Sequence, residues 1–148
     1  MIIISYIIFG FLILRVLIAF TNLITKRRLS VSEISGNPSV SILIPARNEK
    51  ENIGKLLDNI INQDYPNYEV IVYDDMSEDT TLEVVKHHAG QNKNIRYIEG
   101  KELPEGWLGK NYACHRLSMY ANGSYFLFLD ADVIIKNGLI RNSLGYFR

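Results

Sequence analysis

Two carboxylates stand close together near the end of the sequence, where a very apolar run gives way to a turn. Asp130 and Asp132 close the segment FLFLDAD (126–132), with one alanine between them. An apolar run of this kind is typical of a buried strand, and a turn after it would let both carboxylates face one pocket. Such oxygen ligands suit Mg²⁺ or Mn²⁺, which bind one or two carboxylates together with the phosphate oxygens of a substrate. A solvated turn that caps a helix would use the same residues, so the pair alone does not decide between the two.

A second acidic pair follows another apolar run. Asp74 and Asp75 end the segment YEVIVYDD (68–75). A carboxylate in this place can accept a hydrogen bond from a base N–H or a ribose hydroxyl. The acids could instead cap the next helix and complement its dipole, a role that suits the following residues SEDT (77–80). Two consecutive acids are more than capping requires.

Two basic residues belong to loops of the same kind. Arg47 lies in IPARNE (44–49), where the amino terminus of the next helix would favour anionic groups. In isolation this segment equally suits a solvated loop with Asn48 as the helix N-cap. Lys110 follows LPEGWLG (103–109) and could pair with a phosphate. Trp107 could stack on a base or a sugar, or anchor its loop in the core.

Alternating apolar and amphipathic segments must position these residues. We expect strands at 39–46, 68–75, 94–99 and 124–130, and helices at 49–63, 79–90, 110–121 and in the tail. Continuously apolar strands separated by helices predict an α/β fold with a largely parallel sheet, covered on both faces. Ligands of such sheets bind beyond the carboxyl ends of the strands, which is where the polar motifs fall. Acids gathered there would repel one another unless a cation lies between them.

Single residues predict some of the element boundaries. Pro45 should stop the first strand. Thr80 and Glu83 have the spacing of a capping box, and Gly90 should close the same helix. The run FLFL (126–129) predicts a strand that is buried on both faces.

The amino terminus differs in kind from the rest. Residues 2–24 are apolar apart from Arg15, and about 20 such residues suffice to cross a bilayer. We expect a transmembrane anchor at 1–25, a basic linker at 26–38 and a folded part at 39–148. The alternative is a buried or interfacial hairpin of helices. The basic cluster Lys26-Arg27-Arg28 then predicts a single-pass membrane protein with the folded part on the cytoplasmic side.

Composition excludes several other classes. Sixteen basic and sixteen acidic residues leave no net charge, which gives no reason to expect a nucleic-acid partner. Cys114 is the sole cysteine, so no intramolecular disulfide can form, as is usual in a reducing compartment. The sequence has no G-x-G-x-x-G or Walker loop and no recognisable serine or cysteine nucleophile.

In order and spacing, four motifs of the sequence resemble those of the family-2 inverting glycosyltransferases, which have the GT-A fold. The motifs are IPARNE, VIVYDDMSEDTT, GK before a helix, and FLFLDADV. LPEGWLGKNYAC (103–114) is similar to a membrane-bound branch associated with carotenoid-acid and hopanoid glycosylation. The resemblance covers residues 39–148. It implies the N-terminal half of a GT-A domain, a mostly parallel α/β sheet preceded by one transmembrane helix.

The resemblance also implies a nucleotide-sugar site. The nucleotide pocket would be lined by Pro45, Ala46, Arg47 and Glu49, and Asp75 would contact the base with Asp74 beside it. Lys110 would lie near the diphosphate. Asp130 would approach the ribose and sugar, and Asp132 would hold Mg²⁺ or Mn²⁺ with Asp130 as a second metal-site residue. The donor would be a nucleotide diphospho-sugar, most simply a UDP-sugar. A lipid or carotenoid-like acceptor would suit the membrane anchor.

The family's general base is expected in a C-terminal half. Residues 133–148 contain no acid that could serve as that base. We therefore expect a truncated chain, or a half that a separate C-terminal partner completes, with little or no sugar transfer on its own. One alternative is a non-catalytic, membrane-tethered module for nucleotide-sugar binding or assembly. Another is a nucleotidyltransferase, which would need a glycine-rich loop where PARNEKEN (45–52) has none.

Overall fold

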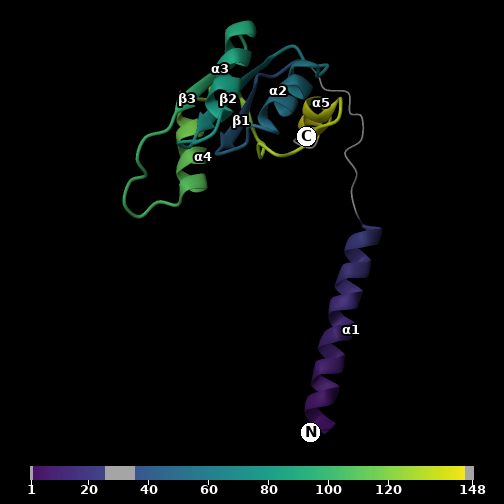
Figure 1. The fold of residues 1–148 in the computed structure, drawn as a ribbon. Coiled ribbons are helices and arrows are strands. Elements are labelled where there is room, and N and C mark those ends of the chain that lie inside the picture. The colour runs from purple at the N-terminus through teal and green to yellow at the C-terminus, as the bar shows by residue number, and fades with distance from the viewer. Residues whose placement is uncertain (1, 26–35, 146–148) are drawn as a thin grey trace. The chain divides into compact units, whose positions relative to one another are not determined.

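The computed structural model describes residues 2–25 and 36–145, which belong to two compact units, residues 1–30 and 31–148 (Figure 1). The first unit is the helix α1 (Ile2–Ile24), which buries none of its side chains. By length and composition α1 could cross a membrane, although a signal sequence would pass the same test. Most of the predicted linker, including Lys26-Arg27-Arg28, lies outside the described residues.

The second unit is built on a parallel sheet of four strands. They are β1 (Val40–Ala46), β2 (Tyr68–Asp74), β3 (Ile95–Glu99) and β4 (Tyr125–Phe128), in the order β3-β2-β1-β4. Every neighbouring pair is parallel. The α/β fold with a parallel sheet predicted from the sequence is confirmed.

Helices cover the two faces of the sheet unequally (Figure 1). The helices α2 (Ile53–Ile61), α3 (Thr81–Gln91) and α5 (Leu139–Leu144) contribute to the larger core, which also takes Ile42 and Ile44 from β1. Helix α4 (Gly109–Tyr120) packs on the opposite face against β1 and β2. Because strand side chains alternate between faces, β1 serves both cores with a run that is apolar except for the buried Ser41.

Pro45 does not stop the first strand, contrary to the prediction. Strand β1 continues to Ala46, and Pro45 lies opposite Tyr73 of β2. The carbonyl of Leu43 accepts a hydrogen bond from Leu129, so the backbone of Pro45, two residues on, faces the same side. Strand β4 has ended there, and a residue without an N–H is therefore tolerated in a central strand.

The predicted capping box of α3 is also wrong. Thr80 makes no side-chain capping bond; instead a carboxylate oxygen of Asp79 accepts a hydrogen bond from the backbone N–H of Thr81 at 2.9 Å. Gly90 lies inside the helix, which ends at Gln91. The side chain of Asn92 then donates to the carbonyl of His88 at 3.2 Å, which satisfies one of the terminal carbonyls.

The prediction that FLFL (126–129) is buried on both faces is wrong as well. Phe126 and Phe128 are 47% and 45% exposed. They lie opposite Ser41 and Leu43 in the register, on the face where α4 covers β1 and β2. Among the described residues β4 is an outer strand of the sheet, and the cover that a parallel strand normally has is missing on this side.

A polar cluster holds the turn between α4 and β4, at the amino ends of the strands. One oxygen of Glu69 accepts hydrogen bonds from the Ser41 hydroxyl at 2.6 Å and the Asn122 backbone N–H at 2.7 Å. The other oxygen pairs with Arg96 at 2.8 Å. Burial acts to raise the pKa of Glu69, but these hydrogen bonds and the charge of Arg96 outweigh it, and the net pKa lies below its ordinary value.

Candidate functional site

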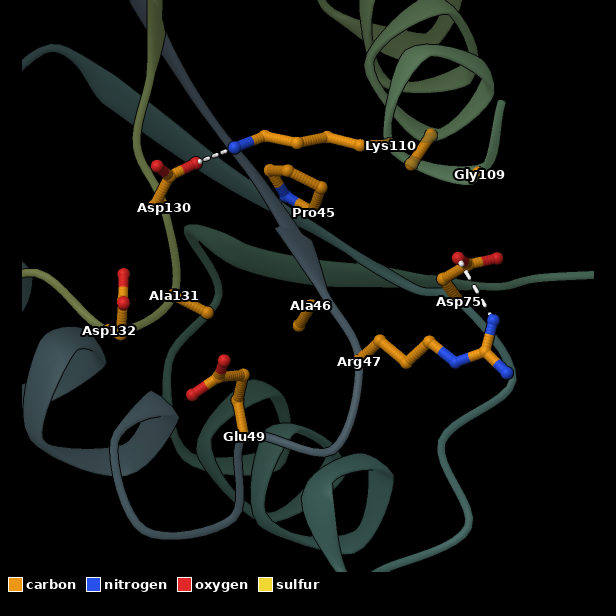
Figure 2. Close-up of a pocket in the computed structure, with 11 residues that line it drawn as sticks. Pro45, Ala46, Arg47, Glu49, Asp75, Gly109, Lys110, Asp130, Ala131 and Asp132 are labelled. Atoms are coloured by element: carbon orange, nitrogen blue, oxygen red, sulfur yellow. Dashed lines mark hydrogen bonds and ion pairs between the residues drawn. The ribbon is translucent and has the colours of Figure 1, made fainter. Parts of the chain in front are cut away.

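A cavity of about 460 Å³ opens at the carboxyl ends of β1, β2 and β4 (Figure 2). The amino terminus of α4 forms one of its walls. The lining residues are Pro45, Ala46, Arg47, Glu49, Asp75, Gly109, Lys110, Ala113, Asp130, Ala131 and Asp132. Eight of the nine residues predicted from the sequence are therefore brought together in one place.

Asp74 is the exception. Its side chain is buried, and one of its carboxylate oxygens accepts a hydrogen bond from the backbone N–H of Ser77 at 3.2 Å. The other oxygen is buried without a partner among the described residues. Asp74 thus shapes the turn after β2, and it does not line the cavity predicted to hold the nucleotide.

One end of the cavity is formed by Asp75, Arg47 and Gly109. A guanidinium nitrogen of Arg47 lies 3.7 Å from a carboxylate oxygen of Asp75, as Figure 2 shows. A Cβ atom added to Gly109 would lie 3.0 Å from the same oxygen of Asp75. The glycine at the first position of α4 therefore lets this carboxylate approach the helix terminus, where the helix dipole favours a negative charge.

Hydrogen bonds between two loops hold Arg47 and Asp75 in place. The backbone N–H of Asn48 donates to the Ser77 hydroxyl at 3.0 Å, and the Asn48 side-chain oxygen accepts from the Glu78 N–H at 2.8 Å. Asn48 adopts a left-handed conformation with φ of 55°, which asparagine tolerates better than most residues. It therefore ties the loop after β1 to the loop after β2, and it is not the N-cap of α2, where Asn52 stands instead.

The other end of the cavity is formed by Lys110 and Asp130. The lysine ammonium donates a hydrogen bond to a carboxylate oxygen of Asp130 at 2.6 Å (Figure 2). This hydrogen bond, together with the charge of Asp130, raises the pKa of Lys110 above its ordinary value. Both side chains are well exposed, so water and salt weaken the attraction and either group can exchange its partner for a ligand.

Asp132 completes the acidic lining. The intervening Ala131 is buried against the core, and this fixes the turn that carries the two aspartates. Asp132 is exposed and makes no hydrogen bond or ion pair with any residue in the described part of the chain. Its carboxylate is therefore available to a ligand.

The cavity carries an excess of negative charge. Six of the lining residues are charged. Two are cations, Arg47 and Lys110, and four are carboxylates, those of Glu49, Asp75, Asp130 and Asp132. The formal charge of the lining is thus minus two. Within residues 2–25 and 36–145, no group of three or more acidic, histidine or cysteine side chains is arranged to hold a metal alone. Asp130 and Asp132 fit a divalent cation only where a substrate supplies further oxygens, which is how Mg²⁺ is commonly bound.

Three small residues of the lining were not predicted. Gly109, Ala113 and Ala131 contribute space and no chemistry. Trp107, a candidate for stacking on a ligand, is not part of the lining. Its ring stacks on His115, with centroids 5.1 Å apart, and meets Tyr112 edge-on at 5.5 Å.

Comparison with known proteins identifies the origin of this arrangement. The family model described as glycosyl transferase family 2 matches residues 41–148. The 4,4'-diaponeurosporenoate glycosyltransferase of Staphylococcus haemolyticus is 36% identical over 67% of this chain and 25% of its own length. A dolichyl N-acetyl-alpha-D-glucosaminyl phosphate 3-beta-D-2,3-diacetamido-2,3-dideoxy-beta-D-glucuronosyltransferase of Methanococcus voltae is 33% identical over 74% of this chain and 34% of its own length.

Solved structures are also similar to this chain. The mannosyltransferase PcManGT from Pyrobaculum calidifontis, in complex with GDP-Man and Mn²⁺, superposes with a TM-score of 0.71 and 26% identity. The match covers 94% of this chain and 40% of that one. Residues 1–349 of S. aureus TarS, in complex with UDP-GlcNAc, give a TM-score of 0.60 and 27% identity over 74% of this chain and 31% of that one.

This chain thus spans about a quarter to a third of the length of these curated relatives. The family match covers most of its residues and includes every residue that lines the cavity. It also agrees with the parallel sheet. The chain belongs to glycosyltransferase family 2 and has a GT-A-like fold.

Proposed function

We propose that this chain is the donor-binding part of a glycosyltransferase that transfers a sugar from a nucleotide diphospho-sugar to a lipid-type acceptor. The observation that carries the proposal is the meeting of three chain turns, after β1, β2 and β4, around one cavity with paired charges at both ends. Its volume lies in the range of small-molecule sites. Relatives solved with GDP-Man and with UDP-GlcNAc support a nucleotide-sugar donor, and we take a UDP-sugar as the first to test.

The two ends of the cavity suit the two ends of such a donor. Asp75, buried beside Arg47, would accept a hydrogen bond from the base. Pro45, Ala46 and Glu49 would line the nucleotide pocket between the ends. Lys110 would turn from Asp130 to the diphosphate, for which its ammonium is a suitable partner. Asp130 would then be free to approach the ribose and the sugar.

The charge of the lining supports a divalent metal as cofactor. A diphosphate that enters a cavity with a formal charge of minus two meets repulsion that two cationic side chains do not cancel. Asp132, with Asp130 beside it, would hold Mg²⁺ or Mn²⁺ together with phosphate oxygens. When bound, the ion would neutralise the diphosphate as it leaves, which is Lewis-acid assistance. Two structural relatives were solved with Mn²⁺.

The membrane supplies the proposed acceptor. A relative named for a carotenoid acid supports an apolar acceptor, and α1 would hold the donor site at the surface where such molecules reside. The basic cluster after α1 favours a cytoplasmic position for the folded unit.

The general base is proposed to lie in the part of the domain that the longer relatives have in addition. That part would either continue this chain or come from a separate C-terminal half. We therefore expect donor binding by this chain and sugar transfer only when that part is present. The non-catalytic alternative predicts donor binding without transfer in both cases.

Titration calorimetry on the full chain in detergent micelles tests the donor site, with UDP-glucose, UDP-GlcNAc and GDP-mannose in the presence and absence of Mn²⁺. We expect binding of one donor that depends on Mn²⁺ and weakens at least about tenfold in Asp132→Ala, since a charge-assisted contact is lost. Asp64→Ala, which removes an exposed carboxylate outside the cavity, is the control and should bind normally. Binding that needs no metal, or that survives Asp132→Ala unchanged, would contradict the proposed roles.

A further inference from the structure

The loop between β3 and α4 exposes apolar side chains that the described part of the chain covers only in part. Each of residues 101–108 is exposed, and in Figure 1 the segment extends away from the sheet. Leu103 and Trp107 are 40% exposed and Leu108 is 71% exposed. We propose that this loop is a bilayer-contact element, which places these three side chains in the lipid interface beside the cavity. The inference rests on the proposed insertion of α1 in a membrane.

Contacts with α4 and within the loop hold Trp107 in place. Trp107 stacks on His115 with an angle of 22° between the rings, and it contacts Tyr112 edge-on. Its backbone N–H donates to the carbonyl of Pro104 at 3.2 Å. Because these contacts already order Trp107, its contact with lipid costs little further conformational entropy.

The residue types fit a lipid interface better than an aqueous surface. Tryptophan is enriched where membrane and water meet, because its ring is apolar while its N–H needs a polar partner. Leucine gains free energy on leaving water, roughly in proportion to the apolar area that is buried. Lys101, Glu102 and Glu105 leave the loop without a strong net charge. The contact is therefore apolar, and it requires no anionic lipid.

Two features of the chain favour a bilayer as the occupant. Fifteen residues, Thr25 to Ser39, connect α1 with β1, so an inserted helix keeps the folded unit at a high effective concentration near the same bilayer. The loop also leads directly into Gly109 and Lys110, which line the cavity. A bilayer that contacts the loop would thus lie next to the cavity, where a lipid-embedded acceptor is needed.

The single tryptophan makes the test selective. Trp107 is the sole tryptophan of the sequence, so fluorescence excited at the red edge reports this loop alone. The full chain is reconstituted into phosphatidylcholine vesicles with and without bromine on the acyl chains, and vesicle flotation reports insertion separately. We expect the brominated lipid to quench Trp107 strongly, iodide in the water to quench it weakly, and the result to be the same at high salt.

Two substitutions sharpen the experiment. Leu108→Ser should lower the partition of the loop into the bilayer about tenfold, and with it the quenching by brominated lipid. The fold should tolerate it, because Leu108 is largely exposed and occupies the N-cap of α4, a position that favours serine. Phe126→Ser is the matched control, since it removes an apolar side chain that is 47% exposed from β4, away from the loop, and should leave the quenching unchanged.

The outcomes separate the two proposals. A chain that floats with the vesicles while Trp107 is quenched by iodide and not by bromine would overturn the loop contact and leave membrane anchoring intact. Protection of Trp107 from both quenchers would also overturn it, because another protein surface would then cover the loop. A chain that stays in the soluble fraction would overturn both.

Discussion

Gly109 offers the sharpest test of the site, because one methyl group should affect the fold and the cavity in opposite ways. It is the first residue of α4, and a Cβ added to it would lie 3.0 Å from a carboxylate oxygen of Asp75. That distance is shorter than an ordinary van der Waals contact, so the carboxylate must move by a few tenths of an ångström. Gly109→Ala therefore displaces the group that we assign to the base while leaving every charge of the cavity in place.

The two effects can be estimated separately. Replacing glycine by alanine in a helix stabilises it by about 0.5–1 kcal/mol, since alanine loses less conformational freedom on folding. Displacing Asp75 weakens one hydrogen bond to the donor, worth about 0.5–1.5 kcal/mol, which corresponds to an affinity weaker by roughly two- to thirteenfold. The close contact offsets part of the helix term, so we expect an unfolding temperature that is unchanged or slightly raised and a donor affinity that is clearly lowered.

Gly90→Ala is the matched control. Gly90 lies inside α3, and a Cβ at this position would have no heavy atom within 4 Å. The substitution should give the full helix gain, a rise of a few degrees in the unfolding temperature, without any change in donor affinity.

Thermal unfolding by circular dichroism and donor titration by calorimetry measure the two quantities on the same samples. A Gly109→Ala chain that binds the donor as tightly as the parent would refute the placement of the base at Asp75. Loss of affinity in Gly90→Ala as well would show that a glycine-to-alanine change without any close contact also weakens donor binding, and it would contradict the assignment of the loss in Gly109→Ala to Asp75.

Three further predictions follow from contacts described above. Lys110→Met should weaken donor binding about tenfold in calorimetry, because the diphosphate loses a cation and Asp130 loses its partner; unchanged binding would remove Lys110 from the site. Glu69→Gln should lower the free energy of unfolding by about 1–2 kcal/mol at neutral pH. Since the pKa of Glu69 lies below its ordinary value in the folded chain, this stability is present above the pKa of the unfolded state and is lost as pH falls through the folded pKa. Denaturant titrations at several pH values should therefore converge for parent and variant in acid, and a constant difference would contradict the assignment. Asp74→Asn should leave donor affinity unchanged, because Asp74 does not line the cavity, while Asp75→Asn should lower it. Equal losses of affinity in the two variants would contradict this distinction between the two aspartates.

The location of the site could be predicted from the sequence because a parallel sheet leaves little choice. Strands that run in the same direction end at the same edge, so acids that follow strand-like runs must meet there. Asp75, Asp130 and Asp132 are brought together for this reason. Their roles in binding stay predictions.

Neighbouring residues of the same type could not be told apart in this way. Asp74 and Asp75 are equivalent as sequence, yet Asp74 is the last residue of β2 and closes its turn, while Asp75 lines the cavity. The difference depends on where the strand ends, and a shift of one residue reverses which side chain faces which way. Asp79 and Thr80 present a related difficulty, because aspartate and threonine side chains can both cap a helix and only the position of its first turn decides between them.

Burial of β4 could not be predicted because it depends on what lies beside the strand. Phe126 and Phe128 are residue types typical of a covered parallel strand. They are exposed because, in the described part of the chain, α4 packs over β1 and β2. The sequence also could not predict that Gly109, Ala113 and Ala131 line the cavity, because a small residue in a cavity is recognised only by the space around it. A glycine directly before a cation at a helix start was the available signal.

Charge shows most clearly how the site depends on the fold. The whole sequence has no net charge, with sixteen residues of each sign, and this balance by itself gives no indication of an acidic site. Folding gathers four carboxylates and two cations around one cavity, and both cations already pair with a carboxylate across elements. A donor with a charged diphosphate must therefore bring or find positive charge. We therefore expect donor binding to depend on a metal, an expectation that rests on the arrangement of the strands and that composition alone cannot provide.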